Sequence, residues 1–575
     1  MIPQKYKSLI YKQNPTTLYF YILSSFFVII FETLSIGSIP IFALALTDNN
    51  NFITNYTENI ELFSNLKQLP KRQIIIYSGL SVVVLFFIKN IILILINYLQ
   101  QKIFKEYKLS VSKMLFKYYV NSEYKFFLYA KPSQLTRTLT IDVGHAFNYF
   151  IAKIVLLREF TIVAIILIFI ISVSPLINLG LFSIFLIFNI IFYLIIKKTL
   201  KKRGEEIHER NAKRFKILSD TFLMIKQIKI NNKESFFTND FFQNTKKIEN
   251  LVFFNNFFNT LPKTVMEMIS VLVIVCFSLL LILYNKSDAY VISVVSLLVA
   301  SGARFIPAFN LITQSFSKTR WLQPSFDLIT KEMRNYIQID VENKSSTKDD
   351  NFNFEKEISF KNFTFGYNEK NILDNINFDI KKGSCIGIIG ESGEGKSTLV
   401  NIIMGLLKTE KNNIFIDGKS LEKNIHNWQK NIGYIPQDVY LMDASIKDNI
   451  AFGIEEKLID EKKIEELIDQ LNLRKFVDSF PNKLNENVGD MAVKISGGQK
   501  QRLGIARALY INPKVLIFDE ATSSLDIENE NKIIEIIKRY KKNKTIILVS
   551  HRSNTLKYCD KVYEIKKGTI SEKKN

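Results

Sequence analysis

The sequence predicts an α-helical membrane domain with six spans, followed by an α/β domain of the phosphate-binding-loop class. Six apolar runs of about 20 residues or more, the length that crosses a bilayer, lie within residues 1–335. A strand-like run, a Gly-rich loop and a helix-like run follow one another at 385–405, the context in which a phosphate-binding loop occurs. A polar stretch without periodicity separates the two parts and predicts a linker at 336–356, so the second domain would occupy 357–575.

The composition supports one membrane part and one soluble part. Of the 575 residues, 47% are apolar and 23% are charged, which is too apolar for an ordinary soluble enzyme and too charged for a chain wholly in lipid. A net charge of +21 fits lysine-rich cytoplasmic loops, and the six apolar runs exclude a soluble nucleic-acid-binding protein. The three cysteines have no regular spacing and predict buried thiols rather than disulfides or a metal site.

The loops between the apolar runs predict the orientation of the membrane domain. Loops 99–146 and 197–253 are long and lysine-rich, and the positive-inside rule places them in the cytoplasm with both termini and the C-terminal domain. Both loops keep a helical pattern, so the spans are expected to continue into the cytoplasm as helices. The six predicted spans are approximately 17–46, 74–98, 147–173, 176–196, 254–284 and 289–315.

The Gly-rich loop predicts a nucleotide site. Residues Gly390 to Ser397 satisfy G-x-x-x-x-G-K-[ST] between a strand and a helix. Glycines let the backbone N–H groups turn towards the phosphates, and the helix N-terminus adds a favourable dipole. Lys396 would reach the β- and γ-phosphates, and Ser397 would bind Mg²⁺. The other predicted phosphate contacts are Ser392, Gly393, Gly395 and Thr398.

Two acids follow a second buried strand, in the segment VLIFDE at 515–520. Asp519 suits a contact to Mg²⁺, usually through water, and Glu520 is placed to polarise the water that attacks the γ-phosphate. A strand that ends in solvated carboxylates is the structural alternative. The position of this strand downstream of a phosphate-binding loop favours the catalytic interpretation.

The segment ISGGQKQRLGIARALY at 495–510, together with these two motifs, resembles the ATP-binding cassette (ABC) family. The resemblance implies that Tyr367 stacks on adenine and that Gln437 touches Mg²⁺ and the membrane domain. It also implies that His551 is the switch histidine and that Asp526 belongs to the D-loop. The signature residues, implied to contact the γ-phosphate of ATP bound to the other subunit, are Ser496, Gly497, Gly498 and Gln499.

One cassette after six spans resembles a type IV ABC exporter half that works as a homodimer. A heterodimer with a related chain remains open. The resemblance implies that the tips of the two long loops, at 121–135 and 219–237, form coupling helices that dock on the cassettes. Phe126 and Phe127 are candidate docking residues, and ordinary helix packing is the alternative.

Charged residues interrupt the apolar spans at similar depths. Counted from residue 289 at about 1.5 Å per residue, Arg304 lies about 22 Å into its span. An arginine in such a position costs about 3 kcal/mol on insertion scales, so another group must compensate for it. Lys89 and Glu32 lie at about the same level, as do Arg158 and Glu159. Lys263 lies one or two helical turns nearer the cytoplasm, with Glu267 at i+4 able to pair with it.

These charges have two interpretations. Lys89, Lys263, Arg304 and Glu32 could line a cavity that binds a phosphate or pyrophosphate of a lipid headgroup, since arginine binds such groups through two N–H donors. Alternatively, buried ion pairs such as Glu32 with Lys89 could only fix the packing of the helices.

Three stretches of the spans, FETLSIGSIPIF, NTLPKTVMEM and ARFIPAFN, resemble the bacterial flippase of lipid-linked oligosaccharides for protein N-glycosylation. That resemblance implies an ATP-driven flippase for a polyprenyl-pyrophosphate-linked glycan or a related glycolipid, in the bacterial inner membrane. The alternative substrates are peptides, drugs or lipids like lipid A.

Overall fold

The computed structural model describes residues 15–46, 70–173, 202–284, 288–342, 353–367, 370–408, 413–489, 495–523 and 526–573. The chain divides into two compact units. The first is helical and comprises residues 1–122 and 130–345. The second comprises the C-terminal domain from residue 346 onwards and also includes the short segment Glu123–Tyr129.

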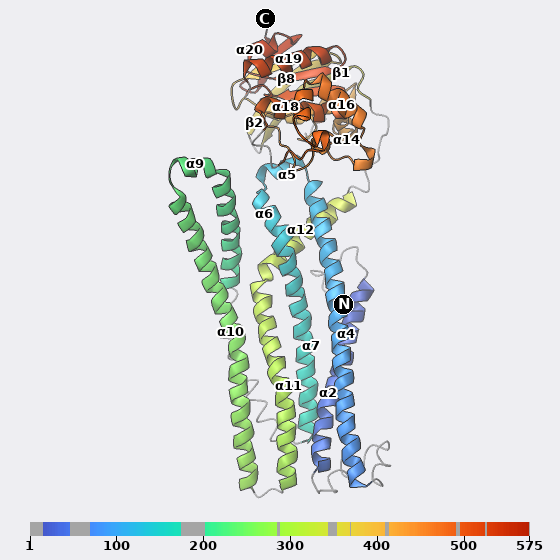
Figure 1. Cartoon of the computed structure of the whole chain (residues 1–575), viewed down its shortest axis with the longest axis vertical. Coiled ribbons are helices and arrows are strands. Elements are labelled where there is room, and N and C mark those ends of the chain that lie inside the picture. The colour runs from blue at the N-terminus through green and yellow to red at the C-terminus, as the bar shows by residue number, and fades with distance from the viewer. Residues whose placement is uncertain are drawn as a thin grey trace. The chain divides into compact units, whose positions relative to one another are not determined.

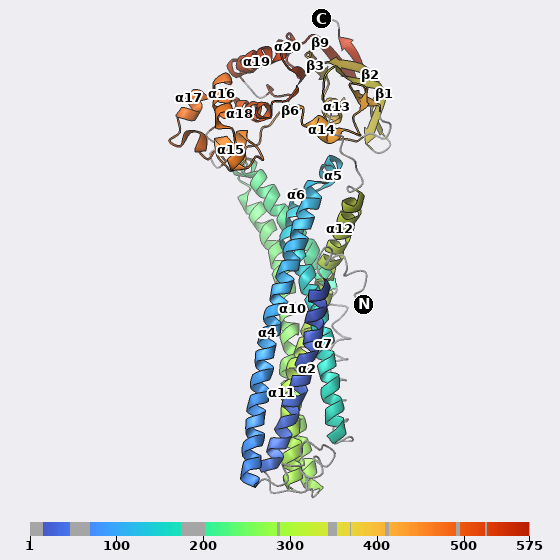
Figure 2. The ribbon, with the colours of Figure 1, turned by 90° about the vertical axis from the view of Figure 1, so that its right-hand side faces the viewer.

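Long helices that run side by side form the first unit (Figures 1 and 2). Their apolar side chains pack in two buried clusters, one that joins α2, α4, α7 and α12 and one that joins α2, α7, α10 and α11. The long helices are α2 (Pro15–Leu46), α4 (Lys71–Val120), α7 (Val143–Val173), α10 (Glu234–Leu283), α11 (Asp288–Trp321) and α12 (Gln323–Glu342), and residues 202–223 form a further helix.

Helices occupy every predicted span that lies within the described residues; the span predicted at 176–196 lies outside them. By length and composition, two helices of the described chain are able to cross a bilayer, Arg72–Val120 and Glu234–Leu283, and Phe27–Ile39 is a shorter apolar stretch. Helix α12 continues to Glu342, so the helical unit extends into the segment predicted as a linker from residue 336. The tight packing of its buried face, which includes Phe326 and Ile329, stabilises it as a helix.

The two long loops are helical, as their periodicity predicts. Helices α4 and α10 each have 50 residues, far more than a bilayer requires. Short helices lie at the tips of these loops, α5 (Tyr124–Tyr129) and α9 (Ile225–Ile230), within the segments predicted as coupling helices. The helix α5 belongs to the same compact unit as the C-terminal domain, and there Glu123 pairs with Lys408 at 2.6 Å.

A buried polar cluster joins three segments of the helical unit. It is built around a single π-helical turn, η2 (Thr138–Asp142), which follows α6 (Pro132–Arg137). Arg137 donates from Nε to Asp142 and lies 2.9 Å from Nε2 of His208, while Ser325 donates to the other oxygen of Asp142. Because a guanidinium only donates, the contact with Arg137 requires Nε2 of His208 to carry a lone pair. The cluster therefore holds His208 in its neutral form.

Two sheets form the C-terminal domain. A six-stranded, mainly parallel sheet has the order β10-β9-β3-β8-β7-β6, and a four-stranded antiparallel sheet has the order β2-β1-β4-β5. The parallel strands are almost continuous apolar runs because both of their faces are buried. The strands are β1 (Glu357–Tyr367), β2 (Lys370–Lys381), β3 (Cys385–Gly390), β4 (Ile414–Ile416), β5 (Lys419–Ser420), β6 (Ile432–Ile435), β7 (Val515–Asp519), β8 (Thr545–Val549), β9 (Lys561–Lys566) and β10 (Thr569–Lys573).

The helices of this domain follow the strands. The helices that matter for the site are α13 (Lys396–Ile403) after β3, α18 (Gly497–Tyr510) before β7 and α19 (Ile527–Lys541) after β7. The others are α14 (Ile425–Gln429), α15 (Ile446–Ile450), α16 (Glu461–Gln470), α17 (Arg474–Asp478) and α20 (Ser553–Leu556).

The expectation of buried thiols is correct for two of the three cysteines. Cys385 and Cys559 are buried with their sulfur atoms 3.8 Å apart, and both are free thiols. Cys276 on α10 is exposed.

The polar cluster at η2 makes a prediction about stability and pH. Burial, and then the Arg137 charge, lower the pKa of His208 below its usual value, and burial does the same for His145 next to it. The charges of Asp142 and Glu209 oppose this shift at His208. The unfolded chain therefore binds protons more readily than the folded chain, and stability should fall as the pH drops through about 6.5 and below.

We expect thermal unfolding of the purified protein, followed by circular dichroism from pH 8 to 5.5, to show this loss. His208→Gln keeps an acceptor for Arg137 without a titrating ring, so its stability should fall less on acidification than that of the wild type. The same substitution at the exposed His426 is the control and should behave like the wild type. Identical acid sensitivity of His208→Gln and the wild type would contradict the assignment.

Candidate functional site

The phosphate-binding loop lies between β3 and α13, as the motif predicts. Gly395 occupies the N-cap position of α13 with φ of 103°, which L-residues with a side chain rarely adopt. A Cβ at this position would also lie 2.9 Å from Ile372. Lys396 is buried and donates to the carbonyl oxygens of Gly390 and Glu391, at 2.8 and 2.9 Å. These neutral carbonyls hold its ammonium group in the place where the loop would receive phosphate.

The other residues predicted in this loop remain accessible. Ser392, Gly393 and Ser397 are exposed, and Thr398 is partly buried in the first turn of α13. Backbone N–H groups of the first helical turn lack helical partners and are available to an anion. The loop is therefore built to receive a phosphate group on its open side.

Two carboxylates stand at the carboxyl end of β7, where the parallel strands of an open sheet place ligands. Glu520 has φ of 49°, a left-handed conformation that is uncommon for a residue with a side chain. Its N–H donates to the carbonyl of Val549 at 3.0 Å, which holds this strained backbone. The ring atom Nε2 of His551 lies 3.5 Å from Oε1 of Glu520. The predicted pair of Glu520 and His551 is thus assembled at one point, on two neighbouring strand ends.

The predicted magnesium ligands are oxygen donors on this same edge of the sheet. Burial raises the pKa of Asp519, which hydrogen bonding and the charge of Lys396 oppose. Gln437 donates to Ser523 at 3.4 Å, on the loop that follows Glu520. A hydroxyl from Ser397, an amide oxygen from Gln437 and the partly buried carboxylate of Asp519 fit Mg²⁺, which prefers oxygen ligands.

Sequence reasoning missed one residue of this edge. Tyr434 on β6 donates its hydroxyl to Oδ2 of Asp519 at 3.2 Å. Tyr434 stands three residues before Gln437. The sequence indication was a single tyrosine, whose hydroxyl can donate a hydrogen bond, in the otherwise apolar strand IGYI.

The signature segment begins helix α18. Ser496 is its N-cap: the Ser496 hydroxyl accepts from the N–H of Gln499, and the Gln499 side chain accepts from the N–H of Ser496. Gly498 packs against α19, where a Cβ would lie 2.5 Å from Asn529. Asp526 caps the start of α19 and accepts from the same Asn529. Asn529 therefore contacts both the signature segment and Asp526. Gly497 is the first residue of α18, directly after the N-cap Ser496.

Tyr367 ends strand β1, with its ring edge-on to Phe365 at a centroid distance of 5.4 Å. It is partly exposed. Its contact with adenine stays a prediction.

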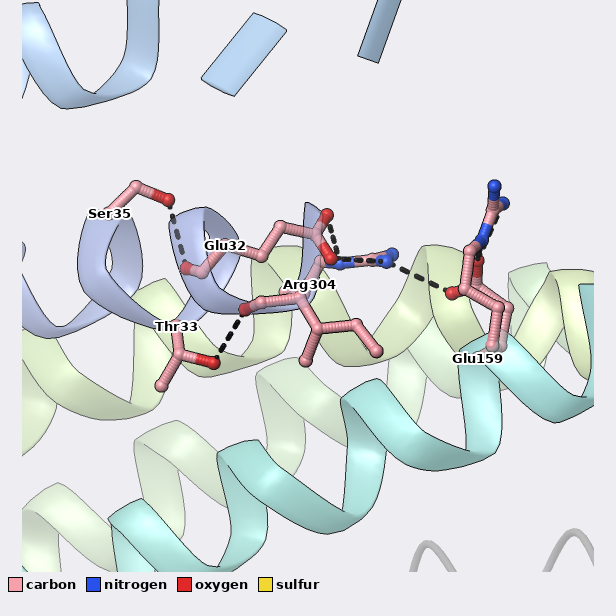
Figure 3. Close-up of polar contacts among 7 residues, drawn as sticks. Glu32, Thr33, Ser35, Glu159 and Arg304 are labelled. Atoms are coloured by element: carbon pink, nitrogen blue, oxygen red, sulfur yellow. Dashed lines mark hydrogen bonds and ion pairs between the residues drawn. The ribbon is translucent and has the colours of Figure 1, made fainter. Parts of the chain in front are cut away.

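Four of the charged residues inside the predicted spans form a compact ionic cluster, part of which Figure 3 shows. Arg304 on α11 donates from Nη2 to Glu32 on α2 and to Glu159 on α7, both at 3.0 Å. Its Nε lies 2.8 Å from the second oxygen of Glu32, although that N–H is not aligned for a hydrogen bond. Arg158 donates from two nitrogens to the other oxygen of Glu159, at 3.0 and 2.9 Å. We call these four residues the ionic clasp.

The clasp changes the interpretation of Arg304. The expectation was a cation free to bind a substrate phosphate, with Glu32 paired to Lys89 as the alternative. In the structure Glu32 pairs with Arg304 instead, and the side chains of Glu159 and Glu32 are 0% and 5% exposed. Two carboxylates inside apolar helices draw the guanidinium because buried charges require close partners. Arg304 therefore joins three helices and forms a buried ion pair of the kind that the second interpretation predicts.

Lys89 and Lys263 have different surroundings from Arg304. Lys89 on α4 is half-buried, its ammonium group 4.6 Å from the centroid of the Phe86 ring, with Glu32 and Arg304 as the charges that act on it. Within the part of the chain that the structure describes, Lys89 has no ion-pair partner. Lys263 on α10 pairs with Glu267 at 3.9 Å, as the i+4 spacing predicts, and both side chains are more than half exposed. Lys89 is thus a cation near the clasp without an ion-pair partner among the described residues.

Comparison with known proteins supports this description of the C-terminal domain. Residues 373–523 match the family model described as "ABC transporter". The chain is 38% identical over 218 residues to a multidrug resistance ABC transporter ATP-binding and permease protein of Lactococcus lactis. It is 41% identical over 223 residues to a leukotoxin export ATP-binding protein of Aggregatibacter actinomycetemcomitans. These alignments cover 38% of this chain and 37% and 31% of the two relatives. The matched segment is thus similar to the ATP-binding part of these transporters.

The similarity in fold to a solved structure covers both the helical unit and the C-terminal domain. A solved structure of a bacterial Atm1-family ABC exporter with ATP bound matches with a TM-score of 0.71 and covers 96% of this chain and 95% of that chain. The sequence identity is 18%, so the match concerns the fold. This chain has the fold of an Atm1-family ABC exporter, with its helical part first and its α/β domain second.

The clasp makes a prediction about stability. Arg304→Gln leaves Glu32 buried without its guanidinium partner, so the free energy of unfolding should fall by about 3–5 kcal/mol. Glu32→Gln combined with Arg304→Gln should cost less than the sum of the two single changes, with a coupling of about 1–3 kcal/mol. Denaturant unfolding in detergent micelles measures each free energy.

The exposed pair Lys263 and Glu267 provides the control for this cycle. The same two glutamine substitutions there should couple by less than about 0.5 kcal/mol, the range of an exposed i,i+4 pair. A coupling at the clasp no larger than at this control pair would mean that Arg304 is not held by Glu32.

Proposed function

We propose that this chain is half of an exporter that hydrolyses ATP to move an anionic, polyprenyl-pyrophosphate-linked glycan or a related glycolipid across the bacterial inner membrane. The observation that carries the ATPase part is the placement of Glu520, strained and 3.5 Å from His551, beside the phosphate-binding loop. The fold of an Atm1-family exporter supports the membrane part.

The residues at the strand ends give the mechanism of hydrolysis. An arriving triphosphate offers Lys396 a stronger partner than its two carbonyls, because a charge-assisted hydrogen bond is roughly twice as strong as a neutral one. Glu520 accepts a hydrogen bond from the attacking water, and His551 orients the same region. Mg²⁺, when bound by Ser397, Gln437 and Asp519, would neutralise charge on the phosphates. Catalysis is mainly positioning and charge neutralisation.

The working unit on this proposal is a dimer of two such chains, identical or closely related. Ser496 and the glycines after it lie at a helix start, where N–H groups favour a negative charge. The resemblance to the ABC family implies that this charge is the γ-phosphate held by the partner chain. The nucleotide-binding domain and both termini would lie in the cytoplasm.

The segment around α5 supports transmission between the ATPase domain and the spans. Glu123 forms an ion pair with Lys408 of the same compact unit. Of the two candidate docking residues, Phe127 is 41% exposed, and its ring packs edge-on against that of Phe126. On this proposal, a conformational change at the nucleotide site moves α5, and α5 passes this movement on to the helices.

The charge balance beside the clasp supports an anionic substrate. Two arginines neutralise the two buried glutamates. Lys89 has no ion-pair partner among the described residues and lies in an apolar helix. Such residues normally face a bundle interior or an aqueous cavity. Lys263, nearer the cytoplasm and exposed, is the second candidate for contact with the pyrophosphate. Exporters of drugs or toxins among the matched relatives keep peptides, drugs and lipids like lipid A as the alternative substrates.

Proteoliposomes that contain a fluorescent polyprenyl-pyrophosphate oligosaccharide test this proposal. Glu520→Gln should bind ATP but lower hydrolysis and flipping by about 100-fold or more, because the general base is lost. Lys89→Gln should reduce the lipid flipped per ATP hydrolysed by about tenfold, the cost of one charge-assisted contact. Lys102→Gln, an exposed lysine of the same helix, is the matched control.

Each outcome separates the parts of the proposal. ATP hydrolysis by Glu520→Gln at the wild-type rate would overturn the assigned motor. Flipping by Lys89→Gln equal to that of Lys102→Gln would overturn the anion contact. Stimulation of ATP hydrolysis by drugs or peptides, without flipping of the labelled lipid, would establish the alternative class of substrate.

A further inference from the structure

The hydrogen bond between Tyr434 and Asp519 connects two neighbouring strands at the nucleotide site. Strands β6 and β7 are parallel, with Tyr434 opposite Ile517, so Asp519 lies two residues further along the same face. An aromatic side chain spans such a diagonal easily. The phenol reaches Oδ2 of Asp519 at 3.2 Å.

Tyr434 contributes little to the packing of its strand. Ile432, Gly433 and Ile435 are buried, whereas Tyr434 is 39% exposed. A phenylalanine would fill the same space and lose only the hydroxyl. The hydroxyl therefore acts on the carboxylate rather than on the core.

The hydrogen bond from Tyr434 occupies one of the two carboxylate oxygens of Asp519. Oδ2 accepts from the phenol, which leaves Oδ1 to face a metal ion or its bound water. Carboxylates that bind metals are commonly held by such outer hydrogen bonds, and loss of one typically weakens metal binding by about 10–100-fold.

We propose that Tyr434 is a positioning residue that orients the Asp519 carboxylate for Mg²⁺ in the nucleotide site. The inference rests on the proposed ATP hydrolysis. It adds a residue that neither the motifs of the sequence nor the family match single out, and it assigns the residue to the metal rather than to the phosphates.

Binding of Mn²⁺ in place of Mg²⁺, measured by electron paramagnetic resonance on the full-length protein with ATP, tests this role. Glu520→Gln serves as the background because it prevents turnover. Adding Tyr434→Phe should raise the Kd for Mn²⁺ by about tenfold or more. Binding of a fluorescent ATP analogue without metal should be unchanged, which also shows that the variant is folded.

Tyr440→Phe is the matched control, because Tyr440 follows the same strand and its side chain is 80% exposed. It should bind Mn²⁺ as the background protein does. Equal Mn²⁺ affinity in the Tyr434→Phe and Tyr440→Phe proteins would overturn the role of Tyr434.

ATPase assays with Mg²⁺ in the active protein add a second readout. Tyr434→Phe should need about tenfold more Mg²⁺ for half-maximal rate, and saturating Mg²⁺ should restore most of kcat. A lower kcat with an unchanged requirement for Mg²⁺ would also contradict the inference. An inactive wild-type protein would instead refute the proposed function, while the Mn²⁺ titration would still decide the role of Tyr434.

Discussion

The pairing of Arg304 with two glutamates is the interaction on which the arrangement of the helical unit depends. A single charge in an apolar helix is costly, and the cost falls only when an opposite charge approaches closely. Glu32, Glu159 and Arg304 come from α2, α7 and α11, so neutralising the charges fixes the mutual register of three helices. Hydrophobic packing alone is less specific, because one apolar turn of a helix can replace another. The ionic clasp thus specifies which turns meet.

The C-terminal domain also has to hold charged side chains in fixed positions, and it does so at the ends of its strands. Its parallel strands end together at one edge, and this edge collects Asp519, Glu520 and His551 from segments far apart in the chain. Glu520 is only partly buried, so the free-energy cost at this edge comes from its left-handed backbone conformation rather than from the burial of a charge. The sheet beneath holds that conformation through the bond to Val549. A rigid scaffold therefore carries the geometry that catalysis requires.

The order of the domains, the helical loops and the strand–loop–helix context of the phosphate-binding loop could be predicted from the sequence, because these depend on local patterns. Period and length identify a span, and the spacing of Lys396 and Ser397 identifies a phosphate-binding loop. The partner of Arg304 could not be read in this way. Glu32 and Arg304 lie 272 residues apart, and only the packing of the helices decides that Arg304, not Lys89, reaches Glu32. The bond from Tyr434 to Asp519 depends in the same way on the register of two strands.

On the proposed function, the clasp also bears on the charge that the transported molecule carries. Counting all basic residues in the spans would suggest a strongly cationic cavity, but the clasp is neutral, with two arginines and two glutamates. Among the residues that the structure describes, Lys89 has no ion-pair partner, so each chain contributes this cation beside the clasp, and a dimer would contribute two copies of it. On the proposed function, a pyrophosphate fits this balance: its negative charges meet the two lysines, while its lipid tail stays among the apolar helices. Arg304 then acts by keeping Glu32 neutralised, since a free Glu32 carboxylate beside Lys89 would cancel the charge that attracts the substrate.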